Sequence, residues 1–484
     1  MPATPAASAT STPATTSAAS TVPPQAPPPV PQGRPGAADP GPSRRTALAE
    51  GIDRVRAGAA TEPGRLRIIG AALALLVIVF GSVTAWQVAE RQDAAHDVLK
   101  RSQPLSSRAA EIYRALANAN TAASSGFLEG GQETAGSRKT FDDEIKLASE
   151  TLVTAASSEP NTDSKTAISE LNKLLPEYTG LVERARANNR QGLPLGGAYL
   201  RYANEKMQEM LTAAERLYKV EKQRLSADYD DATPYPWIAI GVGVLALGGL
   251  AWAQQRNYRR TNRVLNHGLV SATAAVTAVL LWLVVGHSVA RTKLNDSDVH
   301  AVSSLNTLND ARIASLKARA NENLTLVSRG AETEKKEIDG KSVDVDVFDD
   351  DYEQQMRNLT AKLSEAEALA DDSAGVRPVE AATSNMKEWK KRHKVARAAD
   401  DGGNYQAALD KVIGTEDQEP TRVCFNKVDA ALEQAIDHEK GQFEDAAQGG
   451  LNAMDWLWEG AAVLAVLAAA GALLGIGRRL SEYR

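Results

Sequence analysis

Four long stretches without a charged residue limit how this chain can fold. Each runs for about 17 to 20 residues and contains no Asp, Glu, Lys or Arg: Ile68–Trp86, Trp237–Ala253, Leu269–Val285 and Gly460–Ile476. At about 1.5 Å of rise per residue, helices of this length cross a hydrocarbon layer of about 30 Å. One such stretch is compatible with a buried core helix, but four of them predict four transmembrane helices in contact with a lipid bilayer.

Arginines at the ends of these stretches predict how the chain is oriented. Basic residues mark the cytoplasmic ends of membrane helices. The segment RNYRRTNR (256–263) joins the second and third stretches, whereas the opposite flanks are acidic. Both termini and this Arg-rich elbow are therefore predicted to lie in the cytoplasm of a multi-pass plasma-membrane protein. The topology-determining residues are Arg65, Arg67, Arg256, Arg259, Arg260, Arg263, Arg478 and Arg479.

The segments follow the order span, outer segment, span, elbow, span, outer segment, span, which predicts an internal duplication. A short sequence similarity supports it: TFDDE (140–144) in the first half resembles VFDDD (347–351) in the second. We expect a cytoplasmic tail at 1–45, a juxtamembrane segment at 46–66, spans at 67–87, 236–254, 267–287 and 457–477, extracytoplasmic bundles at 88–235 and 288–456, an elbow at 255–266 and a cytoplasmic end at 478–484.

Both large outer segments have helical periodicity. Apolar residues recur at spacings of three and four, which is the seam of near-parallel packed helices or coiled coils; examples are Phe141, Ile145, Ala148, Leu152, Ala155 and Tyr352, Met356, Leu359, Leu363, Ala366. Glycine- and proline-rich breaks divide each segment into four helices. The predicted fold is an all-α membrane protein with two extracytoplasmic antiparallel four-helix bundles in tandem.

The N-terminal tail differs from the rest of the chain. Twelve of the 21 prolines lie in residues 1–45, among Ala, Thr and Ser, so this tail is predicted to be disordered. The net charge of the whole chain is −6, which argues against a nucleic-acid partner. Cys424 is the single cysteine, so no intrachain disulfide can form, and we expect it to be a small buried residue.

A search for catalytic motifs gives no phosphate-binding loop, zinc motif or nucleophile elbow, so we expect no enzyme and no cofactor. The six histidines are scattered singly and are predicted to be surface residues. One acidic run suggests a weak calcium site, although we favour acidic residues that complement the N-terminal dipole of a helix. Its members are Asp344, Asp346, Asp349, Asp350 and Asp351.

Large outer helices joined to membrane spans, with no kinase or cyclase segment in the sequence, resemble bacterial four-helix sensors. More narrowly, the four spans, two outer helical segments, Arg-rich elbow and Ala-rich composition resemble the GlnX-like membrane proteins of actinobacteria. That resemblance implies nutrient sensing: an extracytoplasmic solute-binding lipoprotein carrying glutamate or aspartate signals through the protein to a cytosolic Ser/Thr protein kinase.

Two alternatives stay open beside the relay. A small ligand binds directly between the helices of the bundles, or the protein couples mechanically to a cytosolic ATPase. Residues 46–60 are a weak candidate for docking an ATPase, because Leu48, Ile52 and Val55 share one helical face. A homo-oligomer is also left open by the sequence.

Overall fold

A computed structural model describes residues 61–158, 160–261, 266–296, 301–338, 341–414, 418–454 and 457–480. The chain divides into two units, Met1–Ala57 and Gly58–Arg484, and all described residues belong to the second unit. The predicted tail (1–45) and the candidate docking segment (46–60) lie outside the described residues.

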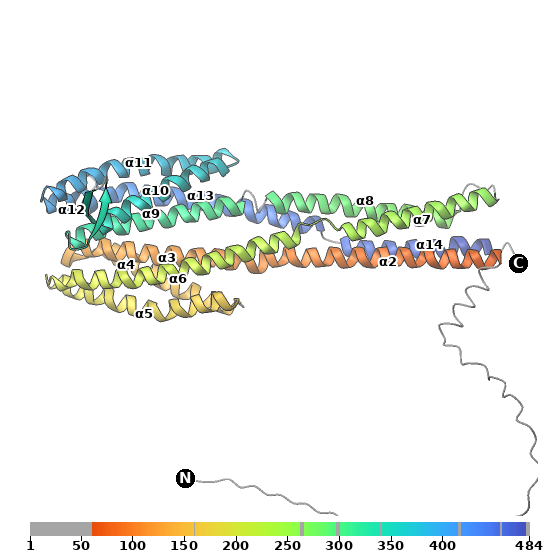
Figure 1. Cartoon of the computed structure of the whole chain (residues 1–484), viewed down its shortest axis with the longest axis horizontal. Helices are drawn as coiled ribbons and strands as arrows, with labels where there is room; N and C mark the ends of the chain where they lie inside the picture. The colour runs from red at the N-terminus through yellow and green to blue at the C-terminus, as the bar shows by residue number, and fades with distance from the viewer. Residues whose placement is uncertain are drawn as a thin grey trace, which may run out of the picture. The chain divides into compact units, whose positions relative to one another are not determined.

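Four helices contain the four apolar stretches: α2 (Glu62–Asp97), α7 (Trp237–Thr261), α8 (His267–Asp296) and α14 (Leu457–Leu480) (Figure 1). Each contains a segment long and apolar enough to cross a membrane. Helix α14 packs along α2 and α8, and α7 packs along α2. The chain is therefore a multi-pass membrane protein, as the sequence predicted.

The start of α2, the start of α8 and the end of α14 meet at one end of the spans. Asn266 Nδ2 donates a hydrogen bond of 2.8 Å to the carbonyl of Gly475, just before α8 begins. A Cβ on Gly70 would lie 3.2 Å from the Ile476 side chain. The end of α7 lies at this same end (Figure 1).

The first helical group contains α3 (Gln103–Leu128), α4 (Ala135–Ser157), α5 (Thr162–Arg190) and α6 (Leu195–Ala232), with a short 3₁₀ turn, η2 (Gly130–Gln132). Helix α3 packs on α4 and α6, and α5 packs on α6. The second helical group contains α9 (Ser303–Ser328), α10 (Val347–Leu369), α11 (Ser373–Asp401), α12 (Tyr405–Ile413) and α13 (Thr421–Met454). Helix α9 packs on α10 and α13, and α11 packs on α13.

Polar caps begin several of these helices where the sequence predicted breaks. Thr134, Asn161 and Asp372 each accept hydrogen bonds from backbone N–H groups in the first turn of α4, α5 and α11. The predicted apolar seams face inward: Phe141, Leu152 and their periodic neighbours are buried, except Ile145, which is half-buried. Periodicity thus identified the faces that pack.

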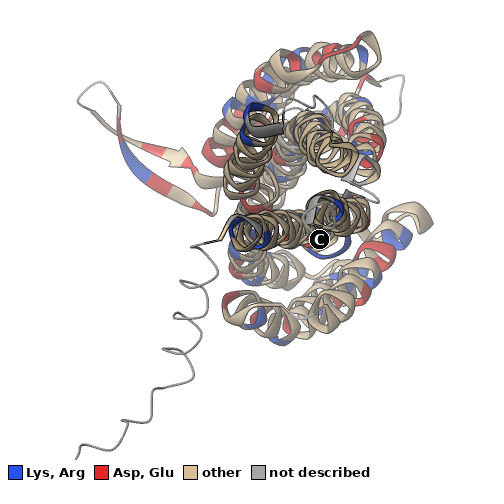
Figure 2. Cartoon of the chain, turned by 90° about the vertical axis from the view of Figure 1, so that its right-hand side faces the viewer, with Lys and Arg blue, Asp and Glu red and all other residues tan. Residues whose placement is uncertain are grey.

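Two strands correct the all-α prediction. In the second outer segment, β1 (Thr333–Ile338) and β2 (Lys341–Asp346) pair as an antiparallel hairpin, with Thr333 opposite Asp346. Figure 2 shows this hairpin standing away from the helices. The strands carry mostly charged side chains, because neither face is covered by a core, so the apolar alternation that identifies a strand is weak.

The two helical groups share one continuous hydrophobic core, which the sequence did not reveal. Helix α3 packs along α9, and Thr121 Oγ1 donates a hydrogen bond of 2.9 Å to the carbonyl of Leu316 across that contact. Asn323 Nδ2 donates to the hydroxyls of Ser124 and Ser125 at 3.1 and 2.8 Å. The halves of the chain are therefore packed against each other.

One span continues directly into its helical group. Helices α2 and α3 are joined by a π-helical turn, η1 (Val98–Ser102), so that the chain is helical from Glu62 to Leu128. Residues 301–302, just before α9, also have π-helical geometry. Helices α6 and α7 are not continuous: α6 ends at Ala232 and α7 begins at Trp237, because Pro234 and Pro236 interrupt the helix.

Candidate functional site

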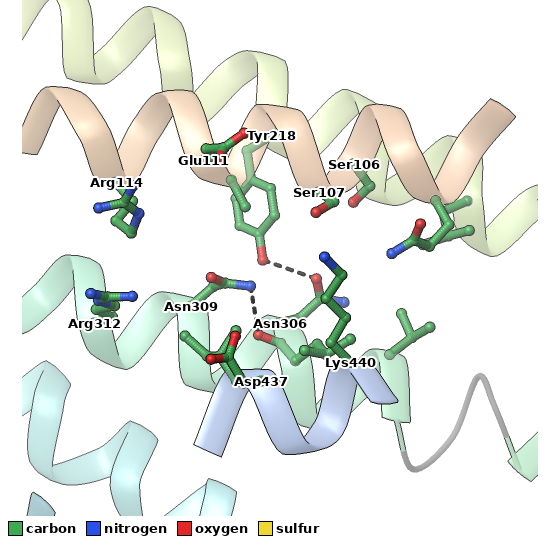
Figure 3. Close-up of a pocket in the computed structure, with 16 residues that line it drawn as sticks. Ser106, Ser107, Glu111, Arg114, Tyr218, Asn306, Asn309, Arg312, Asp437 and Lys440 are labelled. Atoms are coloured by element: carbon green, nitrogen blue, oxygen red, sulfur yellow. Dashed lines mark hydrogen bonds between the residues drawn. The ribbon is translucent and has the colours of Figure 1, made fainter. Parts of the chain in front are cut away.

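A polar cavity of about 240 Å³ lies between the two helical groups (Figure 3). Helices α3 and α6 form one wall, and α9 and α13 form the other, so both halves of the chain build it. Its lining includes Gln103, directly after η1, and Val302, in the short π-helical stretch before α9. The cavity therefore lies where each helical group meets its span.

The wall from the first group is a row of polar side chains on α3, with Tyr218 on α6. Ser107, Glu111 and Arg114 follow one another at steps of four and three residues, so they share one face of α3, and Ser106 lies beside them. Arg114 Nη1 lies 3.2 Å from Glu144 Oε1 on α4. Burial raises the pKa of Tyr218, so its hydroxyl stays neutral and donates a hydrogen bond.

The wall from the second group adds Asn306, Asn309 and Arg312 on α9 and Asp437 and Lys440 on α13. Asn306 Oδ1 accepts the hydrogen bond of Tyr218 at 2.9 Å, which joins the two walls. In Figure 3 the Lys440 side chain extends toward Asn306 and the serines of α3, and Asp437 lies lower in the same opening. Lys440 and Asp437 are exposed.

Arg312 is held by a bidentate ion pair. Its Nε and Nη2 donate to the two carboxylate oxygens of Asp429 at 2.7 and 3.0 Å. Burial lowers the pKa of Arg312, but the hydrogen bonds to Asp429 and the charge of Glu433 outweigh burial and leave this pKa raised. The guanidinium is therefore charged and already neutralised by its neighbours.

At the π turn below the cavity, Ser102 is buried and its hydroxyl contacts two groups. It donates a hydrogen bond to Asp228 on α6 and lies 3.3 Å from the carbonyl of Asp97. π turns occur frequently at functional sites, because one extra residue is accommodated there in the helix. A shift between π and α geometry would change the rotation of α3 relative to α2.

A second set of polar residues is enclosed in the core of the second group. Glu322, fully buried, lies 2.5 Å from Arg319 Nη1 and 2.9 Å from His393 Nδ1, and accepts a hydrogen bond of 3.1 Å from Trp389 Nε1. Burial raises the pKa of Glu322, but Arg319 and His393 outweigh it and leave the pKa lowered. These groups satisfy one another, so the cluster holds α9 and α11 together.

Two histidines contradict the prediction that all six lie on the surface. His393 is 3% exposed and His287 is 4% exposed. His393 stands in the charged stretch KEWKKRHKV, which looks solvated in sequence, yet it lies one helical turn from buried Trp389. His287 is on α8, and its Nε2 has no hydrogen-bond partner among the described residues.

The predicted acidic cluster is divided between a strand and a helix. Asp344 faces Lys335 across the hairpin, and Asp346 caps α10 by accepting from the N–H groups of Phe348 and Asp349 at 2.9 and 3.0 Å. Asp349 and Asp350 lie in the first turn of α10, followed by Asp351. Among the described residues, no group of three or more His, Cys, Asp and Glu is placed to hold a metal ion.

The predicted topology arginines lie at the ends of the spanning helices. Arg65 and Arg67 are in the first turns of α2, Arg256 and Arg259 are near the end of α7, and Arg478 is near the end of α14. Figure 2 looks at this end and shows basic residues on the nearest turns. The side chains of Arg260 and Arg479, and all of Arg263, lie outside the described residues.

Comparison with known proteins supports a sensing role. Residues 94–230 match the family of the actinobacterial sensor domain. That segment includes the first helical group and contributes the α3 and α6 wall of the cavity. No curated protein and no solved structure gives a significant match. The chain therefore contains, in its first helical group, a segment similar to an actinobacterial sensor domain, and the narrower GlnX-like resemblance stays a prediction.

Proposed function

We propose that this protein is a transmembrane signal relay, in which a change at the outer helical groups moves the spans. The observation that carries the proposal is the helix that runs from Glu62 to Leu128 through one π turn, because it makes a membrane span and a sensor-like helix a single element. Each group would act as a four-helix sensor bundle. The protein would act by changing conformation and not by catalysis.

The proposed orientation places both helical groups outside the cell and both termini and the elbow inside. The arginines of α2, α7 and α14 support it, because these helix ends meet at one end of the spans. Basic residues are retained on the cytoplasmic side. With this orientation the cavity lies just outside the membrane.

For the partners, we propose the relay that the GlnX-like resemblance implies. A solute-binding lipoprotein, carrying an amino acid of the glutamate or aspartate type, would contact the outer groups. A cytosolic Ser/Thr protein kinase would read the shift of the spans inside. The match of residues 94–230 to a sensor domain supports a sensing role, and the identity of both partners is the proposed part.

The relay is tested by cross-linking the full protein in its own cells and identifying what is recovered. Recovery of a solute-binding lipoprotein and a Ser/Thr kinase is the expected result, and recovery of neither refutes the relay. One alanine inserted within η1 would rotate α3 by about 100° relative to α2. We expect this insertion to retain both partners but abolish the response of the kinase to amino acids, whereas an alanine inserted after Ser158, in the α4–α5 connection, should preserve it.

The cavity favours a second candidate, a receptor that binds a small ligand directly. Ligand sites are concave and contain a few convergent polar groups, as this one does. A ligand between α3 and α9 would contact both halves of the chain, next to η1 on one side and to residues 301–302 on the other. Such binding would move the same spans without a lipoprotein.

A further inference from the structure

Several polar groups in the cavity have no partner among the residues that the structure describes. Among the described residues, neither Lys440 nor Asp437 forms a hydrogen bond or an ion pair, although both line the cavity. Ser106 is 5% exposed, and its hydroxyl makes no hydrogen bond within the described part of the chain. Asn306 uses its Oδ1 for Tyr218, which leaves its amide Nδ2 as a donor. Buried polar groups are normally hydrogen-bonded, so the buried hydroxyl of Ser106, together with the exposed charges of Lys440 and Asp437, is suited to a polar ligand.

The charges of the cavity select the kind of ligand. Arg312 and Arg114 are neutralised by Asp429 and Glu144. Of the remaining charged groups, Lys440 is the cation and Glu111 and Asp437 are the anions, Glu111 having only a long hydrogen bond of 3.4 Å from Thr151. One carboxylate on the ligand is therefore matched by Lys440 and one ammonium by the two carboxylates, but a second carboxylate has no free cation to bind.

The size of the cavity limits the ligand further. Sites for drug-sized molecules have volumes of about 300 to 1,000 Å³, and this cavity holds about 240 Å³. It therefore suits a metabolite-sized molecule. Figure 3 shows the Lys440 side chain extending toward Asn306 and the serines of α3, with Glu111 on the α3 wall and Asp437 on the opposite α13 wall, so a small zwitterion between the walls can meet a cation and a carboxylate at once.

We propose that this cavity binds a small zwitterion with one carboxylate, one primary ammonium and no further charge, which is the chemistry of a neutral α-amino acid. The carboxylate binds Lys440 and the donors of Ser106 and Asn306, and the ammonium binds Asp437, with Glu111 on the facing wall. The inference rests on the direct-binding form of the proposed function. Because α3 and α9 both contact the ligand, occupancy changes the packing between the halves of the chain.

Calorimetric titration of the full protein in lipid nanodiscs tests the proposal. The probes are the neutral standard α-amino acids, with L-glutamate as a second-carboxylate probe, succinate as a carboxylate-only probe and putrescine as an amine-only probe. At least one neutral amino acid should bind saturably. It should bind at least about 10-fold more tightly than L-glutamate, succinate or putrescine, because a 10-fold change in affinity corresponds to the loss of one charged contact. No saturable binding by any neutral amino acid, or equal binding of L-glutamate, overturns the proposal.

Variants test whether binding occurs in this cavity. Lys440→Gln and Asp437→Asn should each lower the affinity for the bound amino acid at least about 10-fold. Both residues are exposed and have no partner in the described ranges, so the fold should be retained, which the unfolding temperature checks. Lys427→Gln, at an exposed position on the same helix, should leave affinity unchanged. Unchanged affinity in Lys440→Gln places the ligand elsewhere and overturns the assignment.

The two proposals fail separately. Absence of amino-acid binding to the purified protein, together with recovery of a lipoprotein and a kinase from cells, overturns the cavity assignment and leaves the relay standing. Binding that depends on Lys440, without recovery of either partner, supports the cavity and refutes the relay.

Discussion

His393 should make the stability of the second helical group depend on pH. Its ring nitrogens lie 2.9 Å from Glu322 and 3.2 Å from Asp349, and its ring stacks on Tyr352 with centroids 3.6 Å apart. Burial alone would lower the pKa of His393, but the hydrogen bonds to Asp349 and Glu322 outweigh burial and raise the pKa to about 9. The histidine is therefore charged in the folded protein at neutral pH.

The expected magnitude follows from that shift. An unfolded histidine has a pKa of about 6.5, and each pKa unit corresponds to about 1.4 kcal/mol. A folded pKa of about 9 thus corresponds to roughly 3 kcal/mol of stability from the protonation of His393. Because the folded pKa is raised, this contribution is complete below pH ~6.5 and is lost as the pH rises to about 9.

The assay compares the unfolding temperatures of the detergent-purified protein and of its His393→Gln variant. The glutamine side chain at position 393 is uncharged at every pH. The gap between the two proteins should be several degrees at about pH 6 and should narrow by about pH 9.5. His438→Gln is the control, because His438 pairs with Asp372 at the surface at 3.1 Å and such pairs contribute little. A gap that is constant with pH, or that widens as the pH rises, would refute the assignment of charge to His393.

The packing of the helices gives two further predictions, both measured as unfolding temperature. Leu152→Ala removes a fully buried side chain and should cost about 2 to 5 kcal/mol, whereas Val153→Ala, at the adjacent position that is 66% exposed, should change little; equal effects would contradict the packing of α4. Gly460→Ala places a methyl group against the Trp282 indole and should cost about 1 to 3 kcal/mol. Gly241→Ala is the control, because a methyl group at Gly241 would point into open space. A loss of stability in Gly241→Ala equal to that in Gly460→Ala would contradict the contact between α8 and α14.

Helices and their buried faces were predictable because their signals are local. Tyr352, Met356 and Leu359 are fully buried at the spacing that the sequence shows. The breaks were predictable for the same reason, since Asn161 and Asp372 are short polar residues that cap the next helix. The four spans were identified from the length of the sequence stretches that contain no charged residue.

The site itself was not predictable, because it depends on contacts between distant segments. The cavity needs α3 beside α9, and Ser106 and Asn306 are separated by about 200 residues with no local pattern that pairs them. His393 was missed because its neighbours in sequence are lysines and an arginine, although its neighbours in space are Glu322 and Trp389. The hairpin was missed because charged residues obscure its alternation.

Sidedness tests the central claim most directly, because sensing and relaying both need the helical groups outside. Cys424 is the single cysteine and is buried. Replacing it by serine therefore leaves each introduced cysteine as the one site that a maleimide can label. In intact cells, a membrane-impermeant maleimide should label exposed Thr154→Cys and Lys387→Cys, but should label Tyr258→Cys, near the elbow, only after permeabilisation. Labelling of Tyr258→Cys in intact cells, with Thr154→Cys and Lys387→Cys protected until permeabilisation, would contradict the account.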